Sequence, residues 1–224
     1  MGYRFQHLDL TRPQRAAEIV APVGAREIVT AAEPDELALL ARVHDAFEVR
    51  DGVAAAHVHR MAAVAALLAE RLGMGAAQAW MIRAAASLHD IGKLKVSAGV
   101  LLKPGGLDPA ERAMVELHTA AGHQMLSEVD TPLFRLAATI ALTHHERWDG
   151  EGYPLGLRGT DIPLVGRIAA VADVFDALLS ARPYRPAFDF DHTTAALQDG
   201  RGSQFDPEVV DALFSDLGGA LAVR

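Results

Sequence analysis

Apolar residues recur along most of this chain at intervals of three and four positions, which is the spacing of one face of an α-helix. The segment 53–72 shows this pattern most clearly, and its stripe comprises Val58, Met61, Ala65, Leu68 and Leu72. Further helices are predicted over residues 76–90, 108–129, 131–145, 161–180 and 191–198, and a last one from residue 206. No stretch shows the alternation of a β-strand, and no segment repeats. The pattern predicts an all-α domain.

Local signals mark the start of one of these helices. Asp108 and Glu111, with Pro109 between them, have the spacing of a capping box, in which two side chains bond each other's backbone N–H groups. The apolar stripe expected to be buried in this helix comprises Met114, Leu117, Ala121 and Met125. His118 lies beside that stripe and is expected to face inward. Residues 93–106 and 148–159 are rich in glycine and are predicted to be loops.

The start of the chain has a different character. We interpret residues 1–50 as a short N-terminal helical extension and residues 51–220 as the main domain. A short helix is expected over 14–21, and a second one starts at Pro34, a residue that suits a first helical turn. Its apolar positions are Leu37, Leu40, Val43 and Phe47. No residue of the extension suggests chemistry.

Composition narrows the class of protein. Half of the 224 residues are apolar, which is ample for the core of one domain. The formal net charge of -8 argues against binding of a nucleic-acid polymer. The absence of cysteine excludes disulfides, thiolate metal sites and cysteine nucleophiles. The first residues lack the apolar segment of a signal peptide, and the longest apolar run, 61–69, is far shorter than the roughly 20 residues that span a bilayer. We therefore expect a cytoplasmic protein without membrane insertion.

The chemistry is concentrated around the segment His89-Asp90-Ile91-Gly92-Lys93. Gly92 is expected to end the helix that begins near residue 76, so that His89 and Asp90 fall on its last turn. Other polar residues interrupt apolar faces of the predicted helices in the same way. The full set is His57, His89, Asp90, His118, His144, His145 and Asp173.

Each of these residues alone has a structural explanation. A single inward histidine is usually a hydrogen-bonded core residue, and a histidine pair at a helix C-terminus suits the negative end of the helix dipole. Together they are harder to bury, because only Arg60 and Lys93 are near enough in the pattern to offer a countercharge.

Five imidazoles and two carboxylates suit divalent Fe, Mn, Ni, Co or Zn. Seven ligands exceed the needs of one tetrahedral ion but suit a pair, with Asp90 as the natural bridge. Two ions about 3.5–4 Å apart can hold a bridging hydroxide and clamp a phosphoryl group for in-line displacement. Two divalent ions less two carboxylates and a hydroxide leave a net charge of about +1, which would attract a phosphodiester to an acidic chain.

The chain from about residue 53 to 217 resembles the HD-GYP family, a branch of the HD metal-dependent phosphohydrolases. The motifs that carry the resemblance are His57-Val58-His59-Arg60, His89-Asp90-Ile91-Gly92-Lys93, His118, residues 144–154 with Gly152-Tyr153-Pro154, residues 172–178, and Arg182-Pro183-Tyr184-Arg185. Their order and spacing together are specific to this family, whereas a histidine next to an aspartate is not.

The resemblance implies an all-helical HD core that hydrolyses the bacterial second messenger cyclic di-GMP to pGpG, and perhaps further to GMP. It implies two divalent metal ions, with Fe or Mn favoured and Zn, Ni or Co as alternatives. One ion would be held by His57, His89, Asp90 and Asp173, and the other by Asp90, His118, His144 and His145. Lys93 would contact the scissile phosphate or protonate the leaving oxygen. The substrate-binding residues would be Gly152, Tyr153, Pro154, Arg182 and Arg185.

The chain departs from the family pattern in two ways. Some members have a glutamate that binds a third metal one helical turn before the first histidine, and Val53 stands there, so we predict a dinuclear site. Many members have a sensor or receiver domain upstream, where this chain has about 50 residues. We expect either a stand-alone phosphodiesterase or a subunit regulated by an upstream signalling partner, with a homodimer as an alternative assembly. The alternatives are an HD phosphohydrolase acting on another nucleotide or cyclic dinucleotide, and a weakly catalytic protein that binds cyclic di-GMP as a signal.

Overall fold

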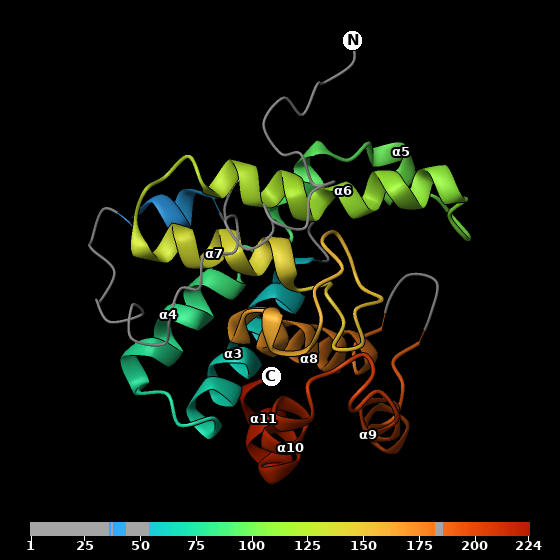
Figure 1. The fold of residues 1–224 in the computed structure, drawn as a ribbon. Helices are drawn as coiled ribbons and strands as arrows, with labels where there is room; N and C mark the ends of the chain where they lie inside the picture. Colours follow the sequence, from blue (N-terminus) through green and yellow to red (C-terminus); the bar gives the residue numbers. More distant parts are fainter. Residues whose placement is uncertain (1–35, 37, 44–53, 182–185) are drawn as a thin grey trace.

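The computed structural model describes residues 36, 38–43, 54–181 and 186–224. These residues form an all-α domain (Figure 1), as the hydrophobic pattern predicts. The main helices are α3 (Ala54–Arg71), α4 (Ala76–Ala86), α5 (Ala98–Leu101), α6 (Pro109–Leu126), α7 (Pro132–Thr143), α8 (Leu164–Leu178), α9 (Phe190–Asp199), α10 (Pro207–Ser215) and α11 (Leu217–Val223). Two short 3₁₀ helices, η1 (Ile91–Lys95) and η2 (Gly159–Asp161), lie in the connections.

The core is built around three long helices. α3 packs against α4 and α8, while α7 packs against α4, α6 and α8 (Figure 1). Four members of the predicted α3 stripe, Val58, Met61, Ala65 and Leu68, are buried, and Leu72 is partly buried. Because α8 packs against both α3 and α7, polar residues on their inner faces are brought close together in the interior.

The capping signals have the expected effect. The side chain of Asp108 accepts a hydrogen bond from the backbone N–H of Glu111 at 2.9 Å, and the backbone N–H of Asp108 donates to Glu111 at 2.9 Å. The predicted capping box is therefore confirmed. It satisfies N–H groups in the first turn of α6 that would otherwise lack a partner.

The predicted buried stripe of α6 is wrong at two positions. Met114 and Leu117 are 52% and 44% exposed, while His118, Ala121 and Gly122 are buried. α6 packs against η1 as well as α7, so its inner face is shifted toward the histidine. Helical spacing gives the period of the stripe, but it does not say which side of a helix meets its neighbours.

Other boundaries also differ from the prediction. α4 ends at Ala86, and the segment 87–90 that carries His89 and Asp90 is a turn beyond the helix. The predicted loop 93–106 contains most of η1 and all of α5. The last predicted helix is two helices, because the backbone breaks at Asp216, whose side chain accepts a hydrogen bond from the N–H of Gly219 and so starts α11.

Part of the N-terminal prediction can be compared with the structure. Residues 38–43 are helical, and Leu40 and Val43 pack against the core, as the spacing predicts. The predicted helix 14–21 and Phe47 lie outside the described residues. Within the described part of the chain, no helix combines the length and the apolarity that a membrane span requires.

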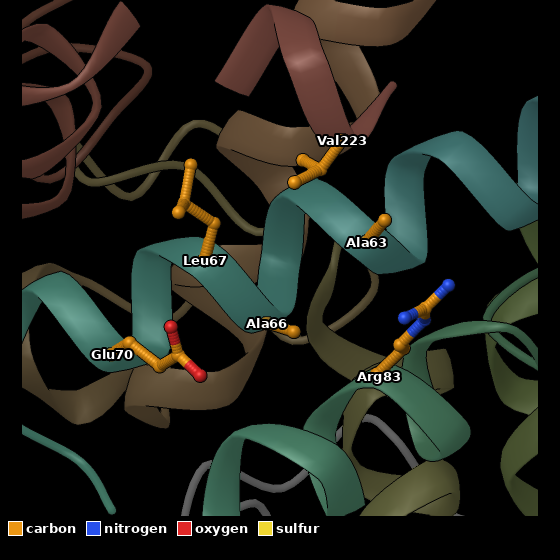
Figure 2. Close-up of a pocket in the computed structure, with 6 residues that line it drawn as sticks. All are labelled: Ala63, Ala66, Leu67, Glu70, Arg83 and Val223. Carbon is orange, nitrogen blue, oxygen red and sulfur yellow. The ribbon is translucent and has the colours of Figure 1, made fainter. Parts of the chain in front are cut away.

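A pocket of about 350 Å³ lies between α3, α4 and α11 (Figure 2). Its lining residues are Ala63, Ala66, Leu67, Glu70, Arg83 and Val223. None of them belongs to the set of histidines and aspartates singled out from the sequence.

Candidate metal centre

The structure brings the seven predicted ligand residues together as two neighbouring groups. In each group, one candidate ligand atom from every residue lies within 4.8 Å of those of the others. One group contains Asp90, His118, His144 and His145, and the other contains His57, His89 and Asp173. They come from α3, the turn after α4, α6, the end of α7, and α8. Segments far apart in the sequence thus meet at one place.

Three imidazoles are oriented by backbone carbonyls. The Nδ1–H of His89 donates to the carbonyl of Ala86 at 2.9 Å, and that of His118 donates to Val115 at 2.6 Å. The Nδ1–H of His144 donates to two carbonyls of α7, at 3.0 and 3.1 Å. A proton held on Nδ1 leaves the Nε2 lone pair of each ring available as a ligand.

The Nε2 atoms converge on Asp90. Nε2 of His118 lies 3.2 Å from Oδ1 of Asp90, and Nε2 of His89 lies 3.3 Å from Oδ2. Nε2 of His118 is also only 3.4 Å from Nε2 of His144. Asp90 therefore touches both groups, as a bridging ligand would. Two imidazole lone pairs facing each other at this distance need an electrophile between or beside them.

Two buried polar atoms at this place test whether a cation fits. Nε2 of His89 and Oδ1 of Asp90 are buried and make no hydrogen bond within the described structure. An unsatisfied buried acceptor is costly, and a nitrogen and a carboxylate oxygen together are typical ligands of a transition-metal ion. The residues present fit divalent cations.

The protonation states of His144, His145, Asp90 and Asp173 favour metal binding as well. Burial lowers the pKa of His144 well below its usual value and that of His145 to about 4, so both rings are neutral at pH 7. Burial alone would raise the pKa of Asp90, but the nearby Lys93 and His89 hold it well below its usual range. Burial alone would raise the pKa of Asp173, but its contact with His57 and the nearby His89 together lower it. Neutral imidazoles and ionised carboxylates are the forms that bind metals.

His57 differs from the other histidines because it lies between two acids. Its Nε2 is 3.1 Å from Oδ1 of Asp173, and its Nδ1 is 2.7 Å from Oδ2 of Asp176. Burial lowers the pKa of His57, but the two carboxylates together raise it to about 9. The pKa of Asp176 is lowered to about 2, because hydrogen bonds from His57 and Arg60 outweigh its burial.

Lys93 reaches the same centre from η1. Its ammonium group forms an ion pair with Oδ2 of Asp90, and its side chain is partly exposed. Gly92 makes this approach feasible, because a Cβ there would lie only 1.9 Å from the carbonyl oxygen of His118. The expected role of Gly92 as a helix end is therefore wrong. It allows η1 to lie against the backbone of α6.

The loop 148–159 places Tyr153 over the cluster. The ring of Tyr153 stacks on the ring of His145 with centroids 4.9 Å apart. The backbone N–H of Tyr153 donates to the backbone carbonyl of His145 at 3.2 Å. A Cβ on Gly152 would lie 2.3 Å from the backbone nitrogen of Arg147, so only glycine fits there. The peptide bond between Tyr153 and Pro154 is cis.

The sequence analysis missed two residues that organise the site. Glu146 is buried, and its carboxylate accepts hydrogen bonds from the backbone N–H groups of Leu155 and Leu157 at 2.7 and 2.8 Å. Arg224 reaches Asp176 from the end of α11. Neither has a local sequence signal, because their partners lie 9, 11 and 48 positions away. Arg182, Arg185 and Val53 lie outside the described residues, so their predicted roles are not compared with the structure.

The fold and the site define the class of this protein. It is an all-α domain with a candidate metal centre of histidines and aspartates in its interior. The family model described as HD domain matches residues 42–209, and the chain belongs to this family. The expected resemblance is confirmed at this level.

Individual relatives agree with the assignment. The chain is 49% identical over 181 residues to the cyclic di-GMP phosphodiesterase response regulator RpfG of Xanthomonas campestris, covering 81% of this chain and 48% of that protein. It is 39% identical over 186 residues to the 3'3'-cGAMP-specific phosphodiesterase 2 of Vibrio cholerae, covering 83% of this chain and 36% of that protein. The chain thus spans half or less of the length of these relatives.

A solved structure supports the fold. An HDG"Y"P protein from Bdellovibrio bacteriovorus superposes with a TM-score of 0.58 over 96% of this chain and 75% of that chain. The two sequences are 16% identical in that comparison, so the likeness concerns the fold alone.

Proposed function

We propose that this chain is a metal-dependent phosphodiesterase that hydrolyses cyclic di-GMP to pGpG, with GMP as the product of a further hydrolysis. The observation that carries the proposal is the pair of ligand groups joined by Asp90, with a nitrogen of His89 and an oxygen of Asp90 buried and not hydrogen-bonded. The name of RpfG, whose sequence is 49% identical, supports cyclic di-GMP as the substrate.

In this proposal the chain binds two divalent ions, with Fe or Mn as the native metal. His57, His89, Asp90 and Asp173 hold one ion, and Asp90, His118, His144 and His145 hold the other. When bound, such a pair supplies Lewis-acid activation of water and of a phosphoryl oxygen. All other steps depend on groups of the chain itself.

Lys93 is the group best placed to handle the substrate phosphate. Its ammonium lies against Asp90 and remains partly exposed, so it is directed at the centre from the solvent side. We assign it the binding of a non-bridging phosphate oxygen, or the transfer of a proton to the leaving ribose oxygen.

Tyr153 forms the wall of the proposed substrate site. Burial raises the pKa of its hydroxyl, and the nearby carboxylates of Glu116 and Asp90 add to this effect, so the hydroxyl remains a hydrogen-bond donor at neutral pH. Gly152 and Pro154 fix the backbone on both sides of this ring. Arg182 and Arg185 are assigned to phosphate or guanine contacts because their planar guanidinium groups suit both.

The name of another relative identifies a second substrate to be tested. The Vibrio cholerae relative that is 39% identical is named as specific for 3'3'-cGAMP. The two cyclic dinucleotides differ in one base, and the metal ligands contact neither base in our proposal. The choice between them must therefore come from residues that line the site beyond the metals.

The test is an anaerobic assay of the purified protein with its metal content quantified. Cyclic di-GMP and 3'3'-cGAMP are supplied separately with Mn²⁺ or Fe²⁺, and products are followed by chromatography. Formation of pGpG or GMP at about two metals per chain supports the proposal. Preferential hydrolysis of 3'3'-cGAMP favours the second substrate, and two bound metals without turnover of either overturn the assignment as a phosphodiesterase for these two substrates.

A further inference from the structure

The side chain of Asp176 is completely buried, yet it is not among the residues grouped as candidate metal ligands. It lies one turn after Asp173 on α8, on the far side of the His57 ring from the centre. Its Oδ2 is 2.7 Å from Nδ1 of His57, while Nε2 of the same ring points to Asp173. The imidazole of His57 therefore spans the distance between Asp176 and the candidate metal centre.

Asp176 is itself held by two guanidinium groups. Arg60 donates from Nε to Oδ1 at 2.8 Å and from Nη2 to Oδ2 at 3.1 Å. Arg224 donates from Nε to Oδ1 at 2.7 Å. Ser180 completes the arrangement: its hydroxyl donates to Oδ2 at 3.2 Å and accepts from both arginines at 2.9 and 2.8 Å. The carboxylate is fixed from several sides and has no freedom to turn toward the metals.

The support for His57 differs in kind from that of three other rings. His89, His118 and His144 donate from Nδ1 to backbone carbonyls of their own segments, so their orientation follows from the local fold. The orientation of His57 depends instead on a charged side chain from another helix. That side chain in turn depends on Arg60 of α3 and on Arg224 at the end of α11.

We propose that Asp176 is a positioning residue for His57, and that Arg60 and Arg224 act with it to prepare the half of the metal centre formed by His57, His89 and Asp173. Asp176 accepts the Nδ1 proton of His57 in a hydrogen bond, so that Nε2 is the nitrogen offered to the metal. Carboxylates behind ligand histidines set the ring orientation and raise its basicity in this way. The inference rests on the metal centre put forward under the proposed function.

The main test uses Asp176→Asn. An amide keeps the shape of the carboxylate but can turn its NH₂ group toward Nδ1, which places the ring proton on the nitrogen that should bind metal. Metal-free protein is titrated with Co²⁺ and followed by visible absorption, with the number of ions per chain measured separately. We expect one Co²⁺ to bind as in the wild type and the second to bind about 10–100-fold more weakly.

Asp211→Asn is the matched control. Asp211 also accepts two hydrogen bonds from one arginine, Arg201, at 2.8 and 2.7 Å, but this pair is exposed. We expect Co²⁺ binding by this variant to equal that of the wild type. If both Co²⁺ affinities of Asp176→Asn also stay within about twofold of the wild type, the proposed positioning role is wrong.

A second variant guards against loss of folding in Asp176→Asn. Arg224→Met retains both Asp176 and His57 and removes one guanidinium group from the carboxylate. We expect a smaller loss of Co²⁺ affinity than in Asp176→Asn, and we expect it at the same one of the two sites. Arg224→Lys should recover this affinity. Equal Co²⁺ binding by Arg224→Met and the wild type would overturn the role of Arg224.

Failure of the proposed function gives a different result. Wild-type protein that binds two Co²⁺ ions but hydrolyses no cyclic dinucleotide contradicts the phosphodiesterase, while the titrations still decide the role of Asp176. Wild-type protein that binds no Co²⁺ overturns the metal centre and the positioning role together.

Discussion

The carboxylate of Glu146 accepts a hydrogen bond from the backbone N–H of Leu155 at 2.7 Å, across the loop that carries Tyr153. The same carboxylate accepts a second bond from Leu157. Glu146 directly follows the candidate ligands His144 and His145, so one short segment supplies two candidate metal ligands and the anchor of the loop. Glu146 thereby helps to fix the Tyr153 ring relative to the candidate metal centre.

Replacing Glu146 by alanine tests this anchor. The variant leaves the N–H groups of Leu155 and Leu157 without their acceptor, which costs about 1–3 kcal/mol for a buried group. For a chain of this size, each kcal/mol lowers the melting temperature by about 2–4 °C. We expect a lower melting temperature by calorimetry, and a higher KM for the cyclic dinucleotide with metal content retained.

Glu146→Gln is the control for that experiment. Burial raises the pKa of Glu146, and in the glutamine variant an amide oxygen still accepts one of the two bonds. The loss of stability should be smaller than in the alanine variant. Equal effects of the two substitutions would contradict the hydrogen-bond explanation.

Gly152→Ala should separate loop geometry from metal binding. The added methyl group would lie 2.3 Å from the backbone nitrogen of Arg147 and 2.6 Å from the carbonyl oxygen of His145, so the loop must move away from the cluster. We expect a fall in kcat/KM of at least about tenfold, which is the cost of 1.4 kcal/mol of transition-state stabilisation. Metal content, measured by elemental analysis, should be unchanged, and loss of metal would show that the loop supports the ligands.

Asp90→Ala should remove metal and activity together. Asp90 is the acidic residue that contacts histidines of both ligand groups, so its loss affects both ions. We expect the fall in activity to exceed the ~10–100-fold loss that usually follows mutation of a residue hydrogen-bonded to a metal ligand. Elemental analysis and the phosphodiesterase assay on the same preparation check this, and an active variant with two bound metals would refute the ligand assignment.

Tyr153→Phe should lower kcat/KM for the substrate and leave the metal content unchanged. The ring remains to stack on His145, and only the hydroxyl is lost. We expect a loss of about 0.5–1.5 kcal/mol in transition-state binding, the usual value of one hydrogen bond between neutral groups. Kinetics and metal content are measured in parallel, and depletion of metal in this variant would mean that the hydroxyl supports the cluster.

The sequence predicted those parts of the fold that depend on neighbours along the chain. The capping box of Asp108 and Glu111 and the stripe on α3 are local patterns, and both are present. The exposure of Met114 and Leu117 could not be predicted, because it depends on where η1 packs. The site behaves in the same way: the candidate ligands follow from motifs, whereas the contacts of Asp176 with His57, Arg60 and Arg224 are set by the tertiary fold.

The ligand groups are drawn from α3, the turn after α4, α6, the end of α7, and α8, so bound ions would join most of the core helices to one another. A ligand that binds only the folded chain raises the free energy of unfolding by RT ln(1 + [L]/Kd), about 2.7 kcal/mol for each site at a hundredfold excess over Kd. Resistance to heat and to proteolysis would then vary with the concentration of free metal, and metal starvation would remove the protein as well as its activity.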